Sequence, residues 1–106
     1  MAAINLNRTQ FEQHIHSDTP VLVDFWAPWC SYCVKIAPAY DRVADQCGDD
    51  LIVAKVNVDE ELRLAQAERI EVIPTLVLYR SGEALGSIVA PTSQVMIEDF
   101  IRETLV

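Results

Sequence analysis

The fold is decided by the stretch Val21-Leu-Val-Asp-Phe-Trp-Ala-Pro-Trp-Cys-Ser-Tyr-Cys-Val-Lys-Ile-Ala-Pro38. Residues 21–26 form an almost fully apolar run, which is typical of a strand covered on both faces. Beyond Pro28, one helical stripe holds Cys33, Ile36, Ala37, Tyr40, Val43, Ala44 and Cys47. Cys30 and Cys33 bracket the start of this predicted helix. A strand that runs into a helix with Cys-x-x-Cys at the junction indicates a redox motif in an α/β chain.

The rest of the chain predicts four further strands and three further helices. Asn7, with Gln10 three residues later, is expected to cap a helix that buries Phe11 and Ile15. The other predicted elements are strands at 2–6, 51–58, 75–79 and 85–89, a helix from 59–61 to about Arg69, and a final helix capped by Thr92 or Ser93. The final helix is expected to bury Val95 or Met96, Phe100, and Ile101 or Leu105. This order implies a mixed sheet with helices on both faces.

Length and charge limit the classes of function. A chain of 106 residues is expected to form one domain, spanning 1–106, and a monomer. The net charge of −8 disfavours nucleic-acid binding, which needs clustered Lys and Arg. No run of eighteen apolar residues is present, so we expect no membrane span. The start lacks the basic and apolar segments of a signal peptide, which favours a cytoplasmic protein.

Two of the three cysteines, Cys30 and Cys33, are expected to form the redox pair, and Cys47 is expected to take no part in it. Reduced thiols are the default in the cytosol, so a structural disulfide framework is not expected. Cys47 lies fourteen residues beyond Cys33 on the same predicted helix, about 21 Å along its axis. A disulfide needs Cα atoms within roughly 7 Å. Cys47 therefore cannot pair with Cys33 within the chain, and it is expected to be half-buried in the last helical turn before Gly48.

Several motifs resemble those of the thioredoxin family. The matching segments are Val23-Asp24-Phe25-Trp26-Ala27-Pro28-Trp29-Cys30, then Cys33, Ile36-Ala37-Pro38, and Ile73-Pro74-Thr75. The resemblance implies a thioredoxin fold, with a mixed sheet of about five strands and four flanking helices. It also implies a dithiol–disulfide oxidoreductase that acts on protein disulfides and binds neither cofactor nor metal. The expected reductant is a flavin- and NADPH-dependent thioredoxin reductase.

The two paired cysteines are expected to have different roles. Cys30 would lie at or just before the first turn of the helix, where unpaired backbone N–H groups and the helix dipole favour a thiolate. Cys33 lies one turn later on the core-facing stripe and should be less exposed. We therefore predict that Cys30 is the nucleophile, and that Cys33 resolves the mixed disulfide.

Asp24 is predicted to be the proton acceptor for Cys33. It lies inside an apolar strand, where burial of an isolated carboxylate costs free energy and raises its pKa. The resemblance places this aspartate beneath the resolving cysteine and pairs it with a lysine that corresponds to Lys55. The alternative is a buried Asp24 that only bonds its neighbours.

The predicted substrate-binding residues surround Cys30. By resemblance, a cis peptide bond precedes Pro74, and the exposed backbone of Ile73 pairs with an extended substrate segment. Trp29, Ile73 and Ala90 would form an apolar patch, which Ser31 and Tyr32 complete. Trp26 is expected to pack in the core.

The chain departs from the family pattern between the cysteines. Ser31-Tyr32 stands where most thioredoxins have Gly-Pro, and Tyr32 restores an N–H donor that proline lacks. Extra hydrogen bonds to the reduced form favour a less reducing potential. Val34 replaces a frequent family lysine, which opposes that effect, although Lys35 follows. Our prediction is a pair somewhat less reducing than in a typical thioredoxin. Ala90-Pro91 replaces a glycine-containing turn, so partner recognition is expected to differ.

Two alternatives to a thioredoxin-like activity stay open at the level of sequence. The first is a glutaredoxin-like, glutathione-linked reductase, which the tyrosine before Cys33 suggests. The second is a non-redox binding or iron–sulfur module that uses Cys30 and Cys33. One Cys-x-x-Cys supplies half of a four-ligand site, so metal binding would require a dimer.

Overall fold

The computed structural model describes residues 3–106 and contains five strands and four α-helices in the predicted order. The elements are β1 (Ile4–Asn5), α1 (Arg8–Ile15), β2 (Val21–Trp26), α2 (Ser31–Cys47), β3 (Ile52–Asn57), α3 (Leu62–Ala67), β4 (Thr75–Arg80), β5 (Glu83–Val89) and α4 (Gln94–Thr104). A short 3-10 helix, Gly48–Asp50, follows α2 and was not predicted. The first residue of the predicted strand at 2–6, Ala2, lies outside the described residues.

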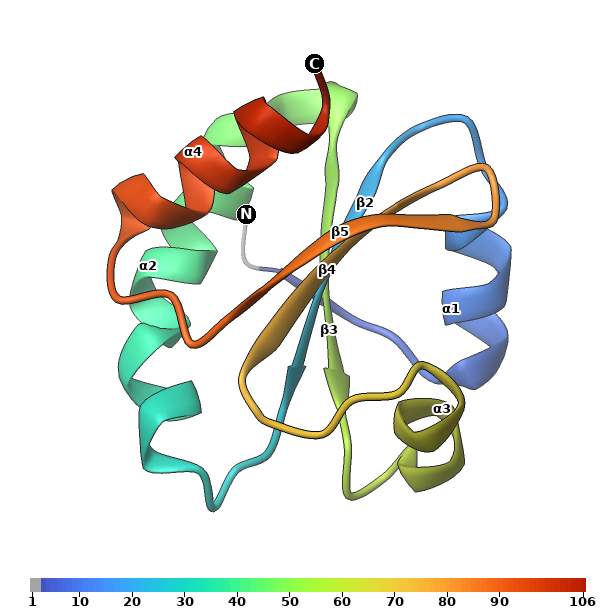
Figure 1. Cartoon of the computed structure of the whole chain (residues 1–106), viewed down its shortest axis with the longest axis vertical. Coiled ribbons are helices and arrows are strands. Elements are labelled where there is room, and N and C mark those ends of the chain that lie inside the picture. The colour runs from blue at the N-terminus through green and yellow to red at the C-terminus, as the bar shows by residue number, and fades with distance from the viewer. Residues whose placement is uncertain (1–2) are drawn as a thin grey trace.

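The sheet is mixed and has β2 at its centre, with strand order β1-β3-β2-β4-β5. β1, β3 and β2 are parallel, whereas β4 runs antiparallel to β2 and β5 antiparallel to β4. Residues 21–25 of β2 are all buried, as its apolar sequence predicts for a central strand. Figure 1 shows β2 and β3 ending at the same edge of the sheet, where the chain leaves β2 for α2.

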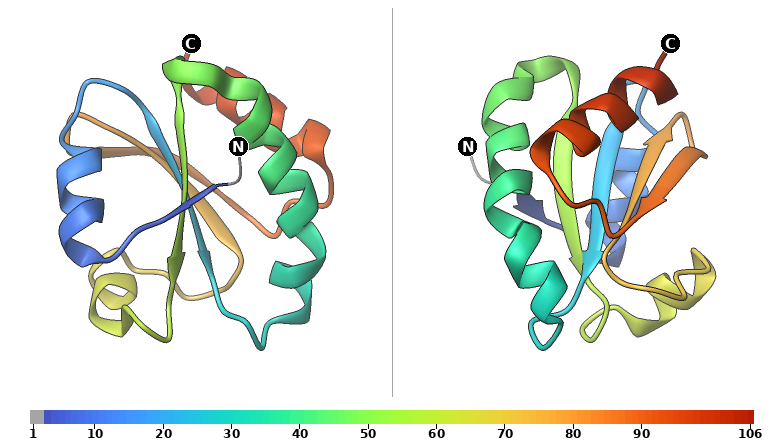
Figure 2. Two further views of the ribbon diagram at one scale, coloured as in Figure 1. Left: turned by 180° about the vertical axis from the view of Figure 1, so that it is seen from behind. Right: turned by 60° about the vertical axis from the view of Figure 1, so that its left-hand side comes forward.

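Two helical layers cover the sheet. Both views of Figure 2 place α2 and α4 together on one face, and α1 with α3 on the other. The first face buries a cluster that includes Leu22, Tyr40 and Ile97, and the second buries Phe11, Phe25 and Tyr79. Side chains alternate between faces along a strand, so Asp24, two residues after Leu22, faces α2. No helix within residues 3–106 is both long and apolar enough to cross a membrane.

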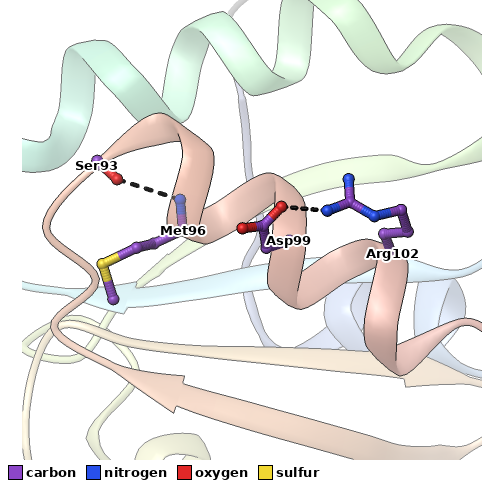
Figure 3. A network of polar contacts seen from close by, with 4 residues as sticks. All are labelled: Ser93, Met96, Asp99 and Arg102. Carbon is purple, nitrogen blue, oxygen red and sulfur yellow. Dashed lines mark hydrogen bonds and ion pairs between the residues drawn. The ribbon is translucent and has the colours of Figure 1, made fainter.

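Helix starts follow the predicted caps. Asn7 and Gln10 form a capping box, in which each side chain accepts a hydrogen bond at 2.9 Å from the other residue's backbone N–H. Ser93 caps α4, because its Oγ accepts from the Met96 N–H at 3.2 Å (Figure 3). The same view shows Asp99 and Arg102 paired one turn further along α4.

Two details of the predicted helices are wrong. In α4, Val95 is 62% exposed and Met96 is 40% exposed, whereas Ile97 is fully buried. The error is confined to the first turn, where Ile97 takes the buried position, because the predicted Phe100, Ile101 and Leu105 do pack against the cluster beneath α2. The predicted helix from 59–61 to about Arg69 is shorter in the structure: Glu61 is the N-cap of α3, which begins at Leu62 and ends at Ala67.

Candidate active site

Cys30 and Cys33 form a disulfide at the start of α2, with their Cα atoms 5.2 Å apart. Cys30 is the N-cap of α2, and its Sγ accepts a hydrogen bond from the Cys33 N–H at 3.2 Å. Cys30 is 8% exposed and Cys33 is 2% exposed, which is the expected order. The first sulfur therefore lies at a helix N-terminus, where backbone N–H groups and the helix dipole stabilise a negative charge.

The loop before β4 and the loop after β5 form a wall beside the disulfide. The peptide bond between Ile73 and Pro74 is cis, as predicted. The Ile73 carbonyl oxygen lies 3.9 Å from Cys30 Sγ, and the Pro74 carbonyl accepts from the Ala90 N–H at 2.9 Å. The Tyr32 hydroxyl donates to the Ala90 carbonyl at 3.4 Å. Four predicted substrate-binding residues are thus brought together around Cys30.

Trp29 and Ser31 are the exposed members of the predicted set. Trp29 is 70% exposed, and its indole N–H donates to the Asp59 carboxylate at 2.8 Å. Asp59 was not predicted as a site residue, because its acidic run was assigned to a helix start. A signal was present: Asp59 follows β3, and the parallel strands β2 and β3 end at the same edge of the sheet.

Asp24 is buried on the face of the sheet that α2 covers. It is 2% exposed, and its Oδ1 has no hydrogen-bond partner among residues 3–106. Burial raises the pKa of this carboxyl to about 7, the Lys55 charge lowers it, and the Asp41 charge raises it. Lys55 lies opposite Asp24 in the register of β2 and β3. The expected rise of the pKa is therefore confirmed.

Lys55 also contacts Trp26. Its Nζ lies 4.3 Å from the centroid of the Trp26 ring. Trp26 packs against the cluster that holds Cys30 and Cys33, in agreement with its predicted packing role. The lysine is therefore held next to the site both by the register of the strands and by the aromatic ring.

Cys47 is half-buried near the end of α2, and burial raises the pKa of its thiol, with the Glu98 charge adding to this. Within residues 3–106, no group of three or more His, Cys, Asp or Glu side chains is arranged to hold a metal ion.

Comparison with known proteins identifies this arrangement. The family model described as thioredoxin matches residues 2–103. The chain belongs to the thioredoxin family. It is 36% identical over 105 residues to thioredoxin 1 of Nostoc sp., with 98% of both chains covered. It is also 36% identical over 104 residues to the thioredoxin of Alicyclobacillus acidocaldarius, with 98% of this chain and 99% of that one covered.

The similarity extends to three-dimensional structure. The solved thioredoxin of Malassezia sympodialis matches with a TM-score of 0.90 at 29% identity, covering 100% of this chain and 96% of that one. The thioredoxin fold predicted from the motifs is therefore confirmed. With Cys30 and Cys33 paired at the start of α2, this thioredoxin-family protein is a dithiol–disulfide oxidoreductase. Family membership implies disulfide-bearing substrates and a thioredoxin reductase as partner.

Proposed function

We propose that the protein reduces protein disulfides, with Cys30 as the nucleophile and Cys33 as the resolving residue. The observation that carries this assignment is the position of Cys30 Sγ at the N-cap of α2, with Cys33 less exposed. The Cys30 thiolate attacks one sulfur of the substrate disulfide and releases the other as a thiolate. The Cys33 thiolate then attacks Cys30 Sγ and releases the second substrate thiolate. Two electrons pass from the cysteine pair to the substrate.

Asp24 is the proposed proton acceptor for Cys33. An acceptor with a pKa of about 7 is ionised in a large fraction of molecules at neutral pH and still binds a proton readily. Its unpartnered Oδ1 and its position under α2 support this role. Lys55 is the proposed charge partner, which keeps part of the buried Asp24 population ionised.

The proposed substrate-binding face comprises Trp29, Ser31, Tyr32, Ile73, Pro74 and Ala90. The exposed indole of Trp29, which precedes Cys30 in the chain, and the half-buried Ile73, which packs against Cys30 and Cys33, offer apolar contacts to a substrate. The backbone of Ile73, next to Cys30 Sγ, is the proposed pairing edge for an extended substrate segment.

The proposed partners follow from the family. The protein would act as a monomeric, one-domain cytoplasmic electron carrier without a bound cofactor. A flavin- and NADPH-dependent thioredoxin reductase would restore the reduced pair. Turnover with this reductase, and not with glutathione alone, separates the proposal from a glutaredoxin-like activity.

Cysteine variants test the assignment of roles. Cys30→Ser should abolish reduction of insulin disulfides, because the attacking thiolate at the helix N-terminus is lost and the remaining Cys33 is only 2% exposed. Cys33→Ser should trap covalent complexes with substrates, since the mixed disulfide is not resolved; mass spectrometry detects the added substrate mass. Cys47→Ser, which changes the half-buried cysteine outside the redox pair, is the control and should retain the activity. Insulin reduction by Cys30→Ser would refute the proposed roles.

A further inference from the structure

A groove of about 460 Å³ begins at the redox site and runs between α2 and α4. The two helices lie side by side on one face of the sheet in Figures 1 and 2. Tyr32 forms part of the lining, and it lies between the two active-site cysteines. Lys35, Arg42 and Gln94 line the groove further along. A chain that leaves a disulfide docked at Cys30 on this side would therefore enter the groove.

The charge of this groove is opposite to that of the whole protein. The chain has 16 Asp and Glu against 8 Lys and Arg. Among residues 3–106, the lining nevertheless contains two cationic side chains, Lys35 and Arg42, and no acidic one. Glu98 accepts from the Gln94 amide at 3.3 Å, but it is not part of the lining.

Arg42 is held in place from the opposite helix. Its Nε–H donates to Gln94 Oε1 at 2.8 Å, which ties α2 to α4 across the groove. The guanidinium has four further N–H donors, and these suit a carboxylate. Lys35 lies seven residues before Arg42, which is close to two helical turns, so both cations lie on the same side of α2.

From these observations, and resting on the proposed reduction of protein disulfides, we infer that the groove binds an acidic segment of the substrate next to its disulfide. Lys35 and Arg42 are about 10 Å apart along the helix axis. Three residues of an extended chain span this distance. The groove therefore selects substrates with two carboxylates about three residues apart near the reactive cysteine.

Matched peptides test this inference. Three peptides share one design, in which a single cysteine forms a mixed disulfide with 2-mercaptoethanol. On each side of this cysteine lie two identical residues, three positions apart. These residues are glutamates in the first peptide, glutamines in the second and lysines in the third. The wild-type protein should reduce the glutamate peptide with a kcat/KM about fivefold above that of the glutamine peptide, as two exposed ion pairs permit. High salt should remove the difference. The net charge of −8 alone favours the lysine peptide.

Charge-removing variants locate the effect. Lys35→Gln/Arg42→Gln should lose the preference for glutamate, whereas Arg80→Gln/Arg102→Gln, with the same change in net charge, should keep it. Equal kcat/KM for the glutamate and glutamine peptides in the wild type would overturn the inference, and so would an unchanged preference in Lys35→Gln/Arg42→Gln. Reduction of the uncharged 2-hydroxyethyl disulfide reports on the redox pair itself. If that reduction persists without a peptide preference, only the groove inference fails; if no disulfide is reduced, the proposed function fails.

Discussion

At the scale of single residues, the role proposed for Asp24 is opposed to the stability of the fold. Its carboxyl is 2% exposed and lacks a partner at Oδ1 among residues 3–106. In the unfolded chain it ionises near its ordinary pKa of about 4. In the folded protein burial raises the pKa to about 7. Between these pH values the folded state binds the additional proton, so Asp24 lowers stability progressively as the pH rises from 4 to 7.

Asp24→Asn should therefore stabilise the oxidised protein above pH 7. The rise of about three pH units corresponds to at most about 4 kcal/mol in the free energy of unfolding. The gain should shrink as the pH falls towards 4, because the folded carboxyl is then protonated and the unfolded one is becoming so. Urea unfolding between pH 4 and 8 measures it, with the exposed Asp49→Asn as control. The same variant should resolve mixed disulfides more slowly than wild type, and a gain independent of pH would contradict the argument.

At the scale of elements, the N-terminus of α2 sets the chemistry of Cys30. Tyr32 is in the first turn, where backbone N–H groups have no partner within the helix. A proline at this position has no N–H to offer to a nearby thiolate. The hydroxyl of Tyr32 has a separate role, because it bonds the Ala90 carbonyl across the site.

Tyr32→Pro should make the pair more reducing. Loss of one N–H donor near the thiolate corresponds to a shift of roughly 10–30 mV, or about 0.5–1.4 kcal/mol. Tyr32→Phe keeps the N–H and removes only the hydroxyl, so its potential should stay near that of the wild type. Equilibration with glutathione buffers measures both potentials. An equal shift of the reduction potential in the two variants would show that the Tyr32 side chain, and not its backbone N–H, sets the potential.

At the scale of the whole molecule, α4 closes the core that supports the site. Ile97 is fully buried in the cluster that also contains Tyr40 and Leu22. The Tyr40 hydroxyl lies within hydrogen-bond distance of the Leu22 and Ala54 carbonyls, at 3.1 and 2.6 Å. Packing of α4 and α2 on the central strands therefore fixes the position of α2, the helix that Cys30 caps.

Ile97→Ala should destabilise the fold by about 2–5 kcal/mol, because it removes buried methyl groups and leaves a cavity. Val95→Ala, two residues earlier in α4 and 62% exposed in the structure, should change stability by less than about 0.5 kcal/mol. Chemical denaturation of the two variants gives the comparison. A larger loss in Val95→Ala would show that the rotation of α4 differs from the one described.

The sequence alone was sufficient for the features that depend on neighbours along the chain. The apolar run at 21–26 predicted β2, Asn7 and Gln10 predicted their capping box, and the spacing of Cys30 and Cys33 predicted the pair at the start of α2. The order of the motifs that resemble those of the thioredoxin family then predicted the fold. These motifs lie far apart in the chain, so together they constrain the topology.

Tertiary structure alone decided the contacts between distant segments. The hydrogen bond from Trp29 to Asp59 joins residues that are 30 positions apart in the chain. The hydrogen bond from Tyr32 to Ala90 joins residues that are 58 positions apart. Likewise, the choice of Ile97 over its neighbours depends on how α4 is rotated against the sheet. Spacing along a chain encodes local hydrogen bonds and the period of a helix. The register of strands and the docking of helices depend on the packing of all elements at once. For this reason the sequence did not predict the hydrogen bonds of Trp29 and Tyr32 or the burial of Ile97.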